Sequence, residues 1–164
     1  MVKIRWIITD SIEDVSLDEF NIEWGGIFGY FEICVNNQVL GFCPDRKLLY
    51  NEEGNEDILY WLFKLSDGTI KLNDGQEYEI QLLSMNLVKI ILKREDKLLV
   101  SLVNSSTDEV IWSEKIMIRE WSNEIKLKIE NFITEIVRVK SVLLNANLIQ
   151  KLTRIKDMLD YEDN

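Results

Sequence analysis

The alternation of hydrophobic and polar residues predicts several short strands before the chain changes to a helical period. Residues 2–9 are predicted to form one strand. Asn36 and Asn37 tolerate the turn conformation of a two-residue hairpin, so we expect strands at 29–36 and 38–43 with Cys34 opposite Val39. In this register the core-facing side chains are Phe31, Ile33, Val35, Leu40 and Phe42. The opposite, wetter face carries Tyr30, Glu32, Cys34 and Cys43.

Two helical segments are predicted within this strand-rich region. A loop or single helical turn is expected around residues 16–20. A longer helix is expected near 56–66, capped by Asn55, with Glu56 and Asp57 in its first turn. Its apolar positions, at Ile58, Leu59, Leu62 and Phe63, follow helical spacing.

Four further strands are predicted at 77–84, 86–94, 97–104 and 109–119. A turn at Glu95 and Asp96 would pair Arg94 with Lys97. Both faces of that strand pair would then be apolar, so we expect the pair to be covered on both sides.

The last third has a helical period. Ser122 or Asn123 could cap a helix, and a second helix follows an interruption at 145–147. The first stripe is Ile125, Ile129, Phe132, Ile133, Ile136 and Val137, and the second is Leu148, Leu152, Ile155 and Leu159. The prediction is an α+β fold with a mostly antiparallel sheet of about six or seven strands, one inserted helix and two C-terminal helices. We expect one domain over 1–164, strand-rich in 1–119 and helical in 120–160, with fraying at 161–164.

The net charge of −10 is confined to one half of the chain. Residues 1–82 carry 16 acidic and 6 basic side chains, whereas residues 83–164 carry 13 of each. An acidic chain is a poor binder of nucleic acid, because phosphate neutralisation requires clustered Lys and Arg. No apolar run is long enough for a membrane span, so we expect a cytoplasmic protein.

Histidine is absent, and this removes the usual catalytic triads, the commonest general base and His zinc sites. Cys34 and Cys43, the only cysteines, would be too far apart in the expected hairpin for a disulfide. No motif for a phosphate, dinucleotide or metal ligand is present. We therefore expect neither an enzyme nor a cofactor or metal site.

The acidic residues gather in two stretches, 10–23 and 52–57, with aromatic residues interleaved. Aromatic anchors ringed by charge are typical of protein interfaces, so the first half is predicted to bind a basic protein partner. The candidate contact residues are Asp10, Glu13, Asp14, Asp18, Glu19, Glu23, Trp24, Tyr30, Glu52, Glu53 and Tyr60. The alternative is that the acids form a solvated face that serves solubility and that the aromatic residues belong to the core.

The order of the parts resembles a known class of proteins. The hairpin segment Gly29–Asn37, the helical segment Glu56–Leu62, the four-strand block and the terminal helices are similar in order to immunity-type proteins encoded beside bacterial polymorphic toxins. This resemblance implies a non-catalytic cytoplasmic inhibitor that binds and blocks one toxin domain, encoded by a neighbouring gene.

Two other classes stay open at this point. One is a small-ligand or enzymatic protein that uses the hairpin face around Tyr30 and Glu32. The other is a structural homodimer subunit that pairs through its C-terminal helices.

Overall fold

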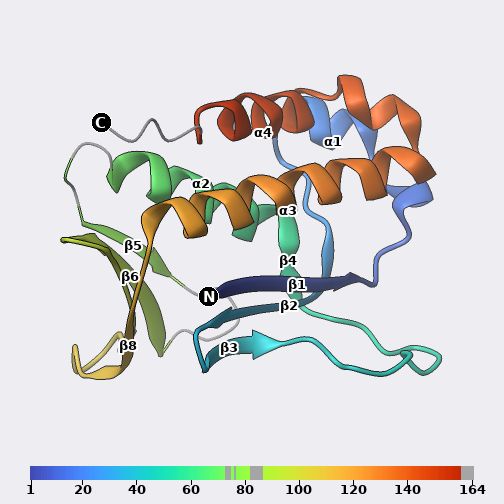
Figure 1. The fold of residues 1–164 in the computed structure, drawn as a ribbon. Helices are drawn as coiled ribbons and strands as arrows, with labels where there is room; N and C mark the ends of the chain where they lie inside the picture. The colour runs from blue at the N-terminus through green and yellow to red at the C-terminus, as the bar shows by residue number, and fades with distance from the viewer. Residues whose placement is uncertain (73–74, 76, 82–86, 160–164) are drawn as a thin grey trace.

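The computed structural model describes residues 1–72, 75, 77–81 and 87–159, and its fold is α+β as the sequence predicts (Figure 1). The strands are β1 (Val2–Ile8), β2 (Phe28–Val35), β3 (Gln38–Phe42), β4 (Glu56–Asp57), β5 (Tyr78–Gln81), β6 (Val88–Arg94), β7 (Leu98–Asn104) and β8 (Val110–Ile116). The helices are α1 (Leu17–Asn21), α2 (Ile58–Lys71), α3 (Ile118–Val139) and α4 (Asn147–Asp157), with 3-10 turns η1 (Ile12–Asp14) and η3 (Ser141–Asn145).

The strands form two antiparallel sheets rather than the single sheet that the sequence predicts. Sheet A has the order β1-β2-β3, with β4 also paired to β2, and sheet B has the order β5-β6-β7-β8. Sheet A ends at β1 because α3 covers the edge of that strand. The carboxylates of Glu120 and Glu124 accept hydrogen bonds from the amides of Val2 and Ile4 at 3.0 and 2.8 Å. Those amides are therefore closed to another strand.

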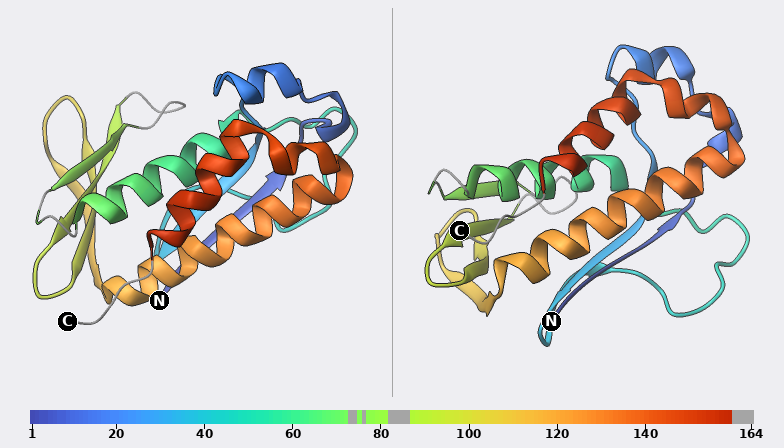
Figure 2. Two further views of the ribbon diagram at one scale, coloured as in Figure 1. Left: turned by 90° about the horizontal axis from the view of Figure 1, so that it is seen from above. Right: turned by 45° about the horizontal axis from the view of Figure 1, so that its top comes forward.

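The helices form a layer that lies over sheet A, with sheet B at one end (Figure 2). The core beneath this layer draws buried side chains from both sheets and from all four helices. Trp61 of α2 stacks on Phe31 of β2 with ring centroids 5.0 Å apart. The buried indole N–H of Trp121 in α3 donates to Thr69 Oγ1 of α2 at 2.8 Å, and this bond joins the two helices.

The hairpin register is confirmed, because Cys34 faces Val39 across β2 and β3. Both cysteines are free thiols, also as predicted. The predicted core face is buried except at Phe42, which is 63% exposed. Gly41 has φ +80°, a conformation that interrupts the regular alternation of β3 just before Phe42.

The predicted register of β6 and β7 is wrong by one residue. Arg94 pairs with Leu98 instead of Lys97, because the turn contains residues 95–97 rather than 95–96. A one-residue shift moves the side chains of a strand to the other face. Leu98, Val100 and Leu102 are thus buried on the core face, while Leu99 lies half-buried on the opposite face. This pair is not fully covered on both sides.

Two predicted helix starts are also corrected. Asp57, not Asn55, caps α2, since its side chain accepts from the amide of Tyr60. Helix α3 begins at Ile118 rather than after Ser122, because Trp121 extends the buried stripe by one turn. Ser16 caps α1 in the expected turn around residues 16–20. The expected fraying at 161–164 and the strand residues 82–84 and 86 lie outside the described residues.

Substitution of Phe132 tests the main helical stripe. Phe132 is fully buried and meets Trp6 edge-on at 6.1 Å. Phe132→Ala should lower the free energy of unfolding by about 3–5 kcal/mol, the usual cost of emptying a buried aromatic site. Leu127→Ala on the same helix, where the side chain is 49% exposed, should change it by less than about 1 kcal/mol. Urea unfolding of both variants measures the difference; equal losses would contradict this packing.

Candidate functional site

The first acidic stretch forms a surface segment, Asp10–Trp24, between β1 and β2. It contains η1 and α1, which lie against the C-terminal helical region (Figure 1). Ile12 and Phe20 are buried and anchor the segment to the core. The acidic side chains between these two anchors remain outside the core, so the local sequence pattern itself turns them towards solvent.

Long-range contacts from the last third of the chain hold this acidic segment. The Lys140 ammonium donates to the carbonyl oxygens of Glu13 and Val15 at 2.9 and 2.7 Å. Asn147 Nδ2 donates to the carbonyl oxygen of Asn21 at 2.6 Å. Lys140 thus binds backbone oxygens, and among the described residues it forms no ion pair with the neighbouring carboxylates. Sequence analysis missed Lys140 and Asn147, because more than 120 residues separate them from their partners.

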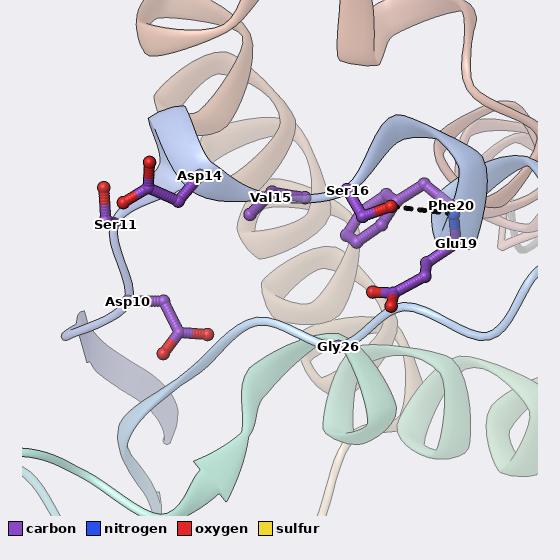
Figure 3. Close-up of a pocket in the computed structure, with 8 residues that line it drawn as sticks. All are labelled: Asp10, Ser11, Asp14, Val15, Ser16, Glu19, Phe20 and Gly26. Atoms are coloured by element: carbon purple, nitrogen blue, oxygen red, sulfur yellow. Dashed lines mark hydrogen bonds between the residues drawn. The ribbon is translucent and has the colours of Figure 1, made fainter.

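The segment surrounds an acidic hollow of about 470 Å³. Figure 3 shows Asp10 and Glu19 directing their carboxylates towards the space between them, above Gly26. The hollow is lined by Asp10, Ser11, Asp14, Val15, Ser16, Glu19, Phe20 and Gly26. Asp10 also accepts a hydrogen bond from the amide of Phe28 at 2.7 Å, and this bond fixes the far wall.

Most acids of this segment have no cationic partner. Within the described chain, Glu23 is the one acidic residue of this segment that forms an ion pair, with the Lys151 ammonium 2.5 Å from its carboxylate. No such pair is formed by Asp10, Glu13, Asp14, Asp18 or Glu19. Unpaired carboxylates close together produce a local negative potential that internal cations do not cancel.

Exposed apolar side chains follow directly after these acids. Trp24 is 83% exposed and Ile22 is 72% exposed. The amide of Trp24 donates to the carbonyl oxygen of Glu19 at 2.9 Å, so the backbone that carries the indole is tied to α1. Trp24 is therefore not a core residue, whereas Trp61, the other tryptophan considered from the sequence, is buried.

The second acidic stretch, 52–57, has mostly internal partners. Glu52 binds Arg46 through both carboxylate oxygens, at 2.7 and 2.5 Å. Glu56 accepts from the indole N–H of Trp61 at 2.8 Å. Asp57 caps α2, and burial raises the pKa of its carboxyl. Two glutamates of this stretch, Glu52 and Glu53, are predicted from the sequence to contact the partner. Of these two, only Glu53 is exposed and has no structural partner among the described residues.

Tyr30, Glu32 and Tyr60 also lie apart from the acidic hollow. Glu32 accepts from Arg5 Nε at 2.9 Å and from the Cys43 amide at 3.3 Å, so its carboxylate is part of the sheet structure. The ring of Tyr30 meets Phe42 edge-on at 6.1 Å. Tyr60 donates its hydroxyl hydrogen to the carbonyl oxygen of Gln81 at 3.2 Å, and partial burial raises its pKa.

Comparisons of the chain with known protein families, curated proteins and solved structures gave no match. Within the described ranges, no helix is long and apolar enough to span a membrane. The same residues contain no group of three or more Cys, Asp or Glu side chains arranged to hold a metal ion. The candidate site is thus the acidic segment Asp10–Trp24, which gathers seven of the predicted contact residues.

The clamp at Glu52 predicts a pH-dependent contribution to stability. Hydrogen bonds from Arg46 and the Leu49 amide lower the pKa of Glu52 from 4.5 to about 2. A carboxyl whose folded pKa is lowered stabilises the fold above its unfolded pKa and loses this effect as pH falls through the folded pKa. Glu52→Gln should therefore lower the melting temperature at pH 7, and the difference from the native chain should shrink between pH 4.5 and about 2. Glu53→Gln is the matched control and should show no comparable trend in thermal melts; a constant Glu52→Gln difference down to pH 2.5 would refute the clamp.

Proposed function

We propose that this chain is a non-catalytic protein-binding protein that binds a basic partner through the acidic segment Asp10–Trp24. The observation that carries this proposal is the group of carboxylates in Asp10–Glu19 without internal cations in the described chain. Exposed charges contribute little to folding, and unpaired like charges oppose it. A basic partner would relieve that repulsion, and this favours binding over a purely structural role.

The geometry suits a two-stage encounter. The negative potential would attract the partner over the ~8–10 Å that physiological salt allows. Trp24 would then supply a large apolar contact at the end of the segment, since tryptophan is among the commonest hot-spot residues of interfaces. The backbone bonds from Lys140 and Asn147 hold the segment before binding, so less conformational entropy is lost on association.

The partner class that we propose is a toxin domain, which the chain would bind and neutralise as an immunity-type protein. Support comes from the resemblance in the order of the sequence elements and from the acidic surface, which complements a basic toxin surface. The hairpin alternative has less support, since the Glu32 carboxylate already binds Arg5 and the Cys43 amide.

Charge reversal tests the acidic segment. Asp14→Lys combined with Glu19→Lys should slow association with the partner by at least ~10-fold at low salt, because electrostatic steering accelerates association by about 10–10³. The dissociation rate should change less, as it does for charges at the rim of an interface. The partner is first sought by co-purification with the product of the adjacent gene. Rates are then measured by surface plasmon resonance between 0.05 and 0.5 M salt, a range chosen to span weak to strong screening.

The matched control carries the same change of charge elsewhere. Glu77→Lys combined with Glu109→Lys alters two exposed acids outside the segment and should leave the association rate within about threefold, the effect of net charge alone. Equal slowing by both pairs would mean that net charge, not the segment, attracts the partner. An association rate that ignores salt and both reversals would reject the proposal.

A further inference from the structure

A second exposed feature lies in the long connection between β3 and β4. Residues 43–55 cross between these strands without regular secondary structure, and Leu49 and Tyr50 near its middle are 69% and 95% exposed. The connection extends beyond the end of sheet A, below β1, whereas α1 lies above that sheet among the helices (Figure 1). Ordered loops of this length frequently have a binding role.

Both ends of the loop are fixed to sheet A. Cys43 and Pro44 are buried, and the Arg5 guanidinium binds the Cys43 carbonyl oxygen at 2.6 Å and also the Asp45 carboxylate. At the other end the Gly54 amide donates to Thr9 Oγ1 at 3.1 Å. Gly54 lies so close to the backbone of Gly29 that a side chain would not fit.

The middle of the loop is a hydrogen-bonded turn. The Glu52 amide donates to the Leu49 carbonyl oxygen at 3.2 Å, and Asn51 has φ +65°, which the third position of several β-turns requires. The Glu52 carboxylate accepts from the Leu49 amide and grips Arg46. These bonds place Tyr50 at the corner of a closed turn. Its side chain forms no hydrogen bond and no ring contact with another described residue.

The structure around the tip indicates the kind of surface it fits. Near the tip, Arg46 and Lys47 match Glu52 and Glu53 in number, and Glu52 is paired with Arg46, so the charges there are balanced. An anionic membrane would be repelled by the acidic first half of the chain, and two side chains bury too little area for firm lipid anchoring. A preorganised Leu-Tyr tip with balanced charges fits a small apolar cleft on another protein.

We propose that the Leu49–Glu52 turn is a second interaction surface, in which Tyr50 and Leu49 insert into an apolar cleft of a partner protein. Glu52, predicted from the sequence to contact the partner, is instead the residue that positions the tip. This surface is separate from the acidic segment and does not depend on the function proposed for it.

Crosslinking at the tip identifies the occupant. A photo-reactive benzoylphenylalanine at position 50 is expressed in the cells that produce the chain, and the same group at exposed position 142 is the control. The protein crosslinked only from position 50 is purified, and its affinity is measured by calorimetry. Tyr50→Ser should weaken binding by at least ~10-fold, as removal of a central aromatic anchor does. Glu52→Gln should also weaken binding, while Val142→Ser should not.

The salt dependence separates this surface from the acidic segment. The loss caused by Tyr50→Ser should be the same at 0.1 and 0.5 M salt, because an apolar contact is not screened, unlike the effect of reversing Asp14 and Glu19. Circular dichroism and thermal melts check that Tyr50→Ser folds. The proposal is overturned by the absence of a crosslink specific to position 50, or by an affinity unchanged in Tyr50→Ser. It is also overturned if phosphatidylcholine or phosphatidylserine vesicles bind the native chain but not Tyr50→Ser.

Discussion

The hydrogen bonds from the edge of β1 to the carboxylates of α3 determine how the rest of the molecule is arranged. Glu120 and Glu124, one helical turn apart, take the amides of Val2 and Ile4 that a further strand would otherwise use. Sheet A therefore ends at β1. Because α3 is fixed along β1, its C-terminal end reaches the segment before α1, where Lys140 binds the carbonyl oxygens of Glu13 and Val15. The acidic surface thus depends on the same helix that closes the sheet.

Local patterns predicted most of the elements but not their assembly. They missed β4, because Glu56 and Asp57 were predicted to form the first turn of a helix. The Asn36-Asn37 turn set the β2–β3 register correctly, because a tight hairpin leaves few alternatives. The stripe through Ile125, Ile129 and Phe132 likewise predicted the buried face of α3. The end of sheet A at β1 depends on contacts between residues 2–4 and 120–124, which no local window contains. The turn at 95–97 shows that a local error can also matter. One extra residue in this turn exchanges the two faces of β7, although the order of apolar and polar residues in the strand is unchanged.

The candidate site could be predicted from the sequence only in the stretch whose acidic side chains have no side-chain partner close by in the sequence. Residues 10–19 contain no Lys or Arg, and the carboxylates there remain without ion pairs in the described structure. Residues 52–57 have a similar density of acids, yet Arg46 and Trp61 lie within a few residues and bind Glu52 and Glu56. The number of acidic residues does not distinguish the two stretches. They differ in whether an arginine or tryptophan side chain five or six residues away donates a hydrogen bond to a carboxylate. An acidic stretch next to arginine or tryptophan is thus a weaker indication of a docking surface than one without them.

The two proposed surfaces would act over different distances. Carboxylates attract a basic partner across several ångströms of water, but this attraction specifies orientation poorly and weakens with salt. An aromatic side chain on a closed turn acts only on contact, and then demands a cleft of matching shape. The acidic segment lies with the helices above sheet A, whereas the connection that carries the Tyr50 turn extends beyond the end of the same sheet, below β1 (Figure 1). One compact domain of a partner would therefore have to reach past the end of β1 to touch both, and a partner too small to do so would use only one. Rates that respond to Asp14 and Glu19 but not to Tyr50, or the reverse, would show which surface a given partner uses.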